Sequence, residues 1–359
     1  MAGWVELGRA AYRRRAWADT VALLGRAGLE DSHDLELLAV AAHLIGRDAD
    51  SSQAWERAHF AAVGAGDREH GAHCAFWLGM LSMMAGEPAK AGGWFARAER
   101  LIPDLGLECP VRGLLMIPMA LEALGRGDAA RAAELVEEVV EVAWRSGDRN
   151  VLAMGLLGLG QSALFTGDTA RGLRLLDETM VAVAAGETSP IVTGIVYCAV
   201  IESCMLAMDL RRAAEWTETL HAWCATQPDL VPYRGQCLVH RSQVLQANGD
   251  WPAAMAEAVA ARERLTDPVH PALGMAWYQL GELHRLRGEQ ADAERAYRAA
   301  SRHGRQPEPG FALLRLAEGN VDAAAAAVRR MLAESPGPLN RAEILAAAVE
   351  VLLAAEDVA

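Results

Sequence analysis

Residues 274–301, GMAWYQLGELHRLRGEQADAERAYRAAS, predict two amphipathic helices joined by a tight turn at Gly288-Glu289. Gly288 stands at the end of the first helix, where glycine adopts the left-handed conformation at least cost. The alanines of the second helix are small enough to let the two helices approach each other. One such hairpin cannot bury its apolar faces alone, so the pattern predicts similar hairpins on either side of it.

The first of these helices carries the W-x2-L-G signature that opens a tetratricopeptide repeat, as Trp277, Leu280 and Gly281. Tyr297 follows at the spacing of the second helix of such a repeat. We interpret Gly281 as the point where the second helix crosses the first, because only a very small residue permits that approach. Trp277 and Tyr297 are large enough to fill the space between neighbouring hairpins.

Turn signals recur along most of the chain. They are 39 to 41 residues apart up to Gly288, and the last step is 31 residues; the series is Gly46, Gly86, Gly127, Gly167, Met208, Gly249, Gly288 and Gly319. The usual repeat has about 34 residues, so the helices or their links must be longer here. We therefore predict an all-α fold: a right-handed α-solenoid of antiparallel helix pairs with a period of about 40 residues and about 18 to 20 helices. No linker or shift in composition divides the chain, and we expect a single domain over residues 1–359.

The end of the chain predicts an incomplete last repeat. Residues 339–354 form a first helix, and Glu356-Asp357 resembles the usual turn, but no partner helix follows. We expect its apolar residues to be only partly covered and available for homodimer formation; they are Ile344, Leu345, Val349, Leu352 and Leu353. The alternative is that this helix is itself the cap of the array.

Composition limits the function classes. Apolar residues make up 52% and charged residues 23%, which excludes global disorder, and the net charge of −13 argues against direct binding of nucleic acid. The longest apolar run, Ile191 to Ile201, is too short to span a bilayer, and the N-terminus does not resemble a signal peptide. We expect a cytoplasmic protein that does not enter membranes.

The repeat places one first-helix position of each hairpin on the concave wall. The residue after the small, glycine-like position is Gln161, Glu202, Gln243 or Glu282, and Gln246, Tyr278 and Arg285 should lie nearby. Helical-repeat proteins bind mostly through this surface, so these residues predict a polar stripe for a peptide or small ligand. The alternative is a merely solvated helix face.

Two arginines, Arg234 and Arg241, could clamp an anion, although such arginines more often pair with acids on the next helix. We expect no metal site and no cofactor: the six cysteines form no CxxC pair, and Cys237 and His240 are better explained as buried core residues. No catalytic motif is present, and we do not expect an enzyme.

Several stretches resemble the helical-repeat region of bacterial LuxR-type transcriptional regulators. They are CAFWLGMLSMMAGEPAKAGGWFARAERL (74–101), SPIVTGIVYCAVIESC (189–204), LRRAAEWTETLHAWCATQPDLVPYRGQCLVHR (210–241) and YQLGELHRLRGE (278–289). The resemblance implies a sensing or protein-interaction scaffold that controls a C-terminal helix-turn-helix domain. We expect the helix-turn-helix domain to be absent from this chain. DNA binding would then depend on that absent domain and not on the repeats. The alternative is a free-standing repeat adaptor that binds a peptide or protein in its groove.

Overall fold

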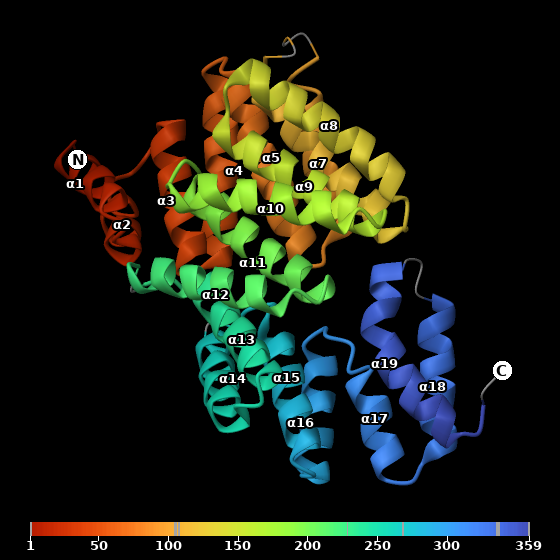
Figure 1. Ribbon diagram of the computed structural model, residues 1–359. Helices are drawn as coiled ribbons and strands as arrows, with labels where there is room; N and C mark the ends of the chain where they lie inside the picture. The colour runs from red at the N-terminus through yellow and green to blue at the C-terminus, as the bar shows by residue number, and fades with distance from the viewer. Residues whose placement is uncertain are drawn as a thin grey trace. The chain divides into compact units, whose positions relative to one another are not determined.

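The computed structural model describes residues 2–103, 106, 108–227, 229–267, 269–334 and 338–357, without the side chains of residues 2, 234, 338–340, 342 and 343. These residues form 19 α-helices and no strand (Figure 1). The predicted all-α repeat fold is thereby confirmed. The helices are α1 (Ala2–Arg13), α2 (Trp17–Leu24), α3 (Ser32–Leu44), α4 (Asp48–Gly64), α5 (Arg68–Met84), α6 (Pro88–Glu99), α7 (Pro110–Gly125), α8 (Ala129–Ser146), α9 (Arg149–Phe165), α10 (Thr169–Ala184), α11 (Pro190–Leu206), α12 (Leu210–Ala225), α13 (Pro232–Ala247), α14 (Trp251–Thr266), α15 (Leu273–Leu286), α16 (Gln290–Arg302), α17 (Gly310–Ala317), α18 (Val321–Glu334) and α19 (Pro338–Ala354).

Every turn of the predicted series separates two helices, and each has a residue in the left-handed conformation. Seven of these residues are glycines with φ between 76° and 90°. The eighth is Met208, which adopts φ 58° although it carries a side chain. The left-handed residue ends one helix and reverses the chain, so the turn signals predicted the helix pairing correctly.

Close approach between the two helices of a hairpin explains the small residue of the repeat signature. A Cβ added to Gly281 would lie 2.7 Å from the ring of Tyr297. Gly8, Gly79 and Gly160 face Leu24, Phe95 and Leu176 in the same way, and in each hairpin the facing residue comes 16 residues after the glycine. The prediction that the second helix crosses at Gly281 is confirmed, and the same crossing recurs along the chain.

The helices group into two compact units. Unit 1 comprises Met1–Ala163, Ala170–Val196 and Ala222–Tyr233, and unit 2 comprises Leu164–Thr169, Tyr197–His221 and Arg234–Ala359. Helices α9, α10, α11, α12 and α13 contribute residues to both units. The expectation of one domain over residues 1–359 stays a prediction, and each unit is described by itself below.

Unit 1 is closed by contacts between residues about two hundred positions apart. The indole nitrogen of Trp17 donates a hydrogen bond of 3.1 Å to Oε1 of Gln227, and both side chains are fully buried. The backbone N–H of Val231 donates to the carbonyl oxygen of Leu44 at 3.0 Å. The segment that follows α12 therefore packs against the first helices of the chain.

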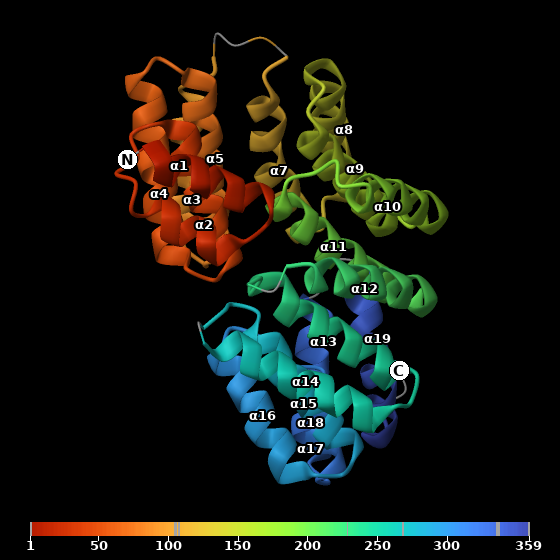
Figure 2. The same cartoon turned by 90° about the vertical axis from the view of Figure 1, so that its left-hand side faces the viewer.

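Unit 2 is built from hairpins whose helices interlock through small residues. Ala254 and Ala258 of α14 pack with Leu280 and Leu283 of α15, and Ala296 of α16 completes this cluster. Figure 2 shows α14, α15 and α16 as neighbours. Trp277 lies at the edge of this cluster, as expected of a residue that fills the space between hairpins.

The last helix, α19, packs against α17 and α18. Ile344 and Val351 are buried in the cluster that the three helices share, whereas Leu345, Val349 and Leu353 are 46%, 58% and 60% exposed. The prediction that its apolar residues would be only partly covered is confirmed.

Candidate functional site

Three of the predicted stripe residues line one pocket of about 460 Å³ in unit 2. Glu202 comes from α11, Gln243 from α13 and Tyr278 from α15, which are the first helices of three successive hairpins. The register of the repeat thus brings side chains 41 and 35 residues apart to one place. The rest of the lining consists of Met205, Leu206, Met208, Met275 and Arg305.

The polar part of this pocket combines a carboxylate, a guanidinium group and a phenol ring. Arg305 lies over the ring of Tyr278, with its Cζ atom 4.8 Å from the ring centre. Glu202 is exposed at the pocket; the protein atoms around its carboxyl group raise the pKa of that group, and Arg305 opposes the rise. The pocket therefore presents an acidic and a basic group beside an aromatic ring.

The apolar part of the pocket is rich in methionine. Three of its residues are methionines, whose unbranched side chains adapt to ligands of different shape. Met208 is 75% exposed and comes from the left-handed turn between α11 and α12. Gln243 completes the lining with its carboxamide, whose Oε1 is 3.3 Å from Nδ1 of the buried His240. The pocket can take an apolar side chain together with hydrogen-bonding groups.

Glu282 and Arg285 do not line this pocket. Their side chains are only 14% and 18% exposed, and Arg285 donates a hydrogen bond of 2.8 Å to Oε2 of Glu282. Tyr297 donates a second bond, of 2.5 Å, to Oε1. Gly310 lies so close that an added Cβ would overlap both Glu282 and Tyr297. The structure therefore places Glu282 and Arg285 in a packed internal network.

The two remaining glutamines of the predicted stripe also lie outside the pocket lining. Oε1 of Gln246 accepts a hydrogen bond of 2.7 Å from the buried Gln279. Gln161 is half-buried in α9 and belongs to unit 1. A binding role for either residue stays a prediction.

Of the two arginines predicted to clamp an anion, the structure describes the side chain of Arg241. Arg241 forms ion pairs of 3.7 Å with Glu218 and 3.6 Å with Glu257, and it lies 3.2 Å from His221. This matches the alternative of pairing with acids on neighbouring helices. The side chain of Arg234 lies outside the described residues.

A second, larger hollow of about 800 Å³ lies between α14, α15 and α16. Its floor includes Trp277 and Leu280, and its lining contains four arginines, Arg262, Arg295, Arg298 and Arg302. Arg262 lies over the Trp277 ring at 5.3 Å, and Arg298 donates a bond of 2.7 Å to Glu294. This surface has no signal in the first-helix pattern of the repeat, because its residues come mainly from second helices.

In the described parts of the chain, no helix combines the length and apolar character needed to cross a bilayer.

No protein-family model and no curated protein matches the chain. Among solved structures, helical-repeat proteins are similar to it. One is a STAND signal-transduction ATPase with a tetratricopeptide repeat sensor from Pyrococcus horikoshii, with TM-score 0.45 and 14% identity over 79% of this chain. The chain spans 44% of that protein. Yeast Tom70 has TM-score 0.36 and 10% identity, covering 99% of this chain and 96% of its own. Human IFIT1, as a dimer with m7Gppp-AAAA, has TM-score 0.48 and 16% identity, covering 99% and 82%.

Proposed function

We propose that this chain is a non-catalytic interaction scaffold that binds a segment of a protein partner in the pocket of unit 2. The observation that carries the proposal is the convergence of Glu202, Gln243 and Tyr278, from three successive hairpins, beside an apolar wall rich in methionine. Concave surfaces of helical repeats are their usual binding sites, and pockets with an apolar wall and a few polar groups are typical of ligand binding.

The proposed ligand is an extended peptide with one apolar anchor. Its side chain would pack on Met205, Leu206 and Met275, which form the apolar wall. Peptide amide groups would hydrogen-bond to the carboxamide of Gln243 and the carboxylate of Glu202, which both line the pocket. A small-molecule effector with the same mixed chemistry is the second type of ligand that this site would take.

The test uses selection from a random peptide library on the full chain, followed by titration of the selected peptides by fluorescence anisotropy. The variant E202A/Q243A/Y278A should lose at least about tenfold in affinity. It truncates all three pocket-lining side chains that were predicted from the sequence. The matched control is R131A/E134A, which removes an exposed ion pair on α8 in unit 1. Equal binding by the triple variant and the wild type, with intact helical circular dichroism, would refute this site.

We further propose that the scaffold is the regulatory region of a cytoplasmic LuxR-type regulator, in which a helix-turn-helix domain binds the DNA. The sequence resemblance over residues 74–101, 189–204, 210–241 and 278–289 supports this assignment. A free-standing adaptor is the alternative. Reading the gene beyond codon 359 separates them: an in-frame helix-turn-helix segment supports the regulator, and a stop codon supports the adaptor.

We also propose that two copies of the chain associate through α19. The exposed face of Leu345, Val349 and Leu353 supports this, because the three residues are four positions apart and lie on one side of the helix. A two-fold pair is the commonest form of such assembly.

A further inference from the structure

A cluster of three histidines and one glutamate lies between α3 and α5 in unit 1. His33 and Glu36 are one turn apart on α3, and His70 and His73 are one turn apart on α5. The Glu36 carboxylate bridges the second pair: Oε2 is 3.6 Å from Nε2 of His70, and Oε1 is 3.3 Å from Nε2 of His73. The rings of His33 and His70 have centres 4.1 Å apart.

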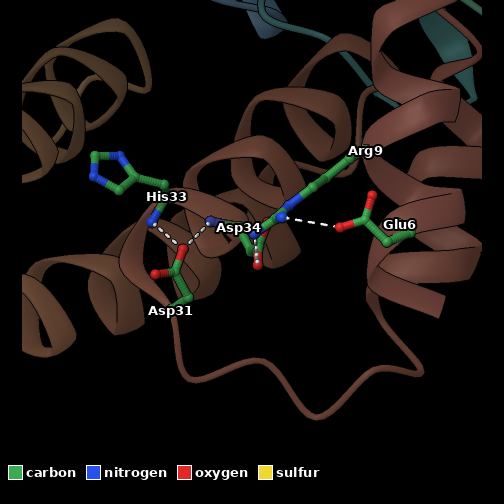
Figure 3. Close-up of polar contacts among 5 residues, drawn as sticks. All are labelled: Glu6, Arg9, Asp31, His33 and Asp34. Atoms are coloured by element: carbon green, nitrogen blue, oxygen red, sulfur yellow. Dashed lines mark hydrogen bonds and ion pairs between the residues drawn. The ribbon is translucent and has the colours of Figure 1, made fainter. Parts of the chain in front are cut away.

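Capping interactions fix the position of His33. Asp31 caps α3, where its Oδ1 accepts hydrogen bonds from the backbone N–H of His33 at 3.1 Å and of Asp34 at 3.0 Å. Arg9 of α1 binds Asp34 with two hydrogen bonds, of 2.6 and 2.9 Å. Figure 3 shows the His33 ring pointing away from Arg9 and Glu6. The first turn of α3 is thereby held while the imidazole stays available to a ligand.

The second helix holds its histidine in the same way. Asp67 caps α5 by accepting a bond of 3.0 Å from the N–H of His70. Burial lowers the pKa of His70, although Glu36 opposes this, and the ring also hydrogen-bonds to the backbone of Ser32. Burial alone would raise the pKa of Glu36, but the hydrogen bond with His73 and the neighbouring histidines hold it below its usual value. The neighbouring histidines thus favour the ionised form of the Glu36 carboxylate.

We propose that His33, Glu36 and His70 bind a divalent transition-metal ion of the zinc class, which links α3 to α5. One donor atom from each residue is available, and the three lie within 4.8 Å of one another. Ligand atoms around tetrahedral zinc are roughly 3.4 Å apart, so small side-chain rotations complete the site. Two nitrogens and one carboxylate suit zinc and its neighbours, whereas magnesium and calcium prefer oxygen ligands alone.

The surroundings fit the needs of such an ion. His33 is exposed, which gives the metal a path of entry, and His70 lies deeper, with a side chain 9% exposed. Metal ligands are commonly oriented by a second hydrogen bond, here from His73 to Glu36 and from His70 to the backbone of Ser32. The ion would join the first helices of two successive hairpins, and it should therefore stabilise this part of unit 1.

The test titrates zinc ions into the full chain, after removal of metals with EDTA, in competition with a chromophoric chelator. The wild type should bind one zinc ion per chain. H33Q and E36Q should each weaken binding at least about tenfold, since even loss of a supporting residue costs that much. The matched control is H284Q: His284 and Glu289 form a histidine–glutamate pair at 2.6 Å outside this cluster, and its loss should leave zinc affinity unchanged.

A second measurement separates binding from damage to the fold. Zinc at a hundredfold excess over its Kd should raise the unfolding midpoint of the wild type, as expected for a ligand of the native state, and should not raise that of H33Q. Because His33 is exposed, H33Q without zinc should unfold like the wild type. Binding without one-to-one saturation, unchanged affinity in H33Q and E36Q, or equal loss in H284Q would each overturn the proposal.

Discussion

Tyr297 of α16 donates a hydrogen bond of 2.5 Å to Glu282 of α15, and Arg285 donates to the other carboxylate oxygen at 2.8 Å. Burial and the neighbouring Glu282 raise the pKa of the Tyr297 hydroxyl, so it remains a donor at all ordinary pH values. The phenol ring is fully buried and packs under Gly281. A residue of the repeat signature therefore also fixes the conformation of a residue predicted for binding.

Replacing Tyr297 with phenylalanine should lower the free energy of unfolding by about 1.5–3 kcal/mol, because a largely buried carboxylate loses a hydrogen-bond donor. The wild type, Y297F, E282Q and Y297F/E282Q form a double-mutant cycle. We expect its coupling energy to be about 0.5–3 kcal/mol. Denaturant unfolding of the four proteins measures it. A coupling energy of zero would mean that the two side chains do not support each other.

Gly281→Ala and Gly92→Ala should change stability in opposite directions. The new Cβ at position 281 would lie 2.7 Å from the Tyr297 ring, so overpacking should cost about 1–3 kcal/mol. Gly92 is an exposed helical position with no neighbour within 4 Å of an added Cβ, and alanine there should stabilise by about 0.5–1 kcal/mol. Thermal and denaturant unfolding of both variants would test this. Equal effects would contradict the helix crossing at Gly281.

The hairpins could be predicted from the sequence because their signals are local. A turn glycine, a small crossing residue and a large residue 16 positions later all lie within one repeat. Met208 occupies the same turn position without being glycine, and only the regular spacing identified it. The fold class and the helix pairing follow from such short-range patterns.

The candidate site could be predicted only in part. The repeat register located Glu202, Gln243 and Tyr278, but Arg305 follows the end of α16 and carries no periodic signal. Glu282 is one turn beyond Tyr278 on the same helix. It is nevertheless largely buried, because it accepts a hydrogen bond from the hydroxyl group of Tyr297. The spacing of residues in the sequence predicts the helix face on which a residue lies. It does not predict which side chain of the next helix will contact that residue.

Contacts between distant repeats had no sequence signal at all. Trp17 and Gln227 are 210 residues apart, and their hydrogen bond depends on how many hairpins separate them. The histidine cluster is similar, because H-x-x-E at 33–36 and H-x-x-H at 70–73 are each common helical spacings. Only the packing of α3 against α5 makes a candidate metal site of them.

Stability should decrease as the pH falls from about 6.5 to about 4, with a contribution from His240. Burial lowers the pKa of this imidazole to about 4, while a hydrogen bond with Gln243 opposes the effect. In the unfolded chain the ring titrates near 6.5, so between these values the unfolded state binds more protons and gains in population. His240 alone can change the free energy of unfolding by at most about 1.4 kcal/mol per pH unit.

The variant H240L should flatten that slope while it keeps the neutral-pH stability within about 1.5 kcal/mol, because Nε2 of His240 is buried without a partner among the described residues. Denaturant unfolding at pH 4.5, 5.5 and 7 gives the comparison. An unchanged slope in H240L would show that other groups determine the acid sensitivity.

The chain itself should bind duplex DNA weakly at physiological salt. Its net charge is −13, and phosphate binding requires a surface rich in lysine and arginine. A mobility-shift titration with duplexes of varied sequence should show no complex at micromolar protein. Sequence-specific binding below that concentration would contradict the proposal that DNA is bound by a helix-turn-helix domain and not by the repeats.

The exposed face of α19 should make the chain self-associate. Val349 and Leu353 are 58% and 60% exposed, so the variant V349E/L353E should keep the stability of the monomer and lose association. Sedimentation velocity over a hundredfold range of concentration measures the association, and hydrogen exchange in residues 338–357 should be slower in the concentrated wild type than in the dilute one. Val181 of α10 is the control: it is 66% exposed in unit 1, and V181E should leave association unchanged. Undiminished association of V349E/L353E, or an equal loss in V181E, would show that the two copies meet elsewhere. Equal protection of α19 at both concentrations, as strong as in the central hairpins, would show instead that the helix is stable without a partner and acts as the cap of the array.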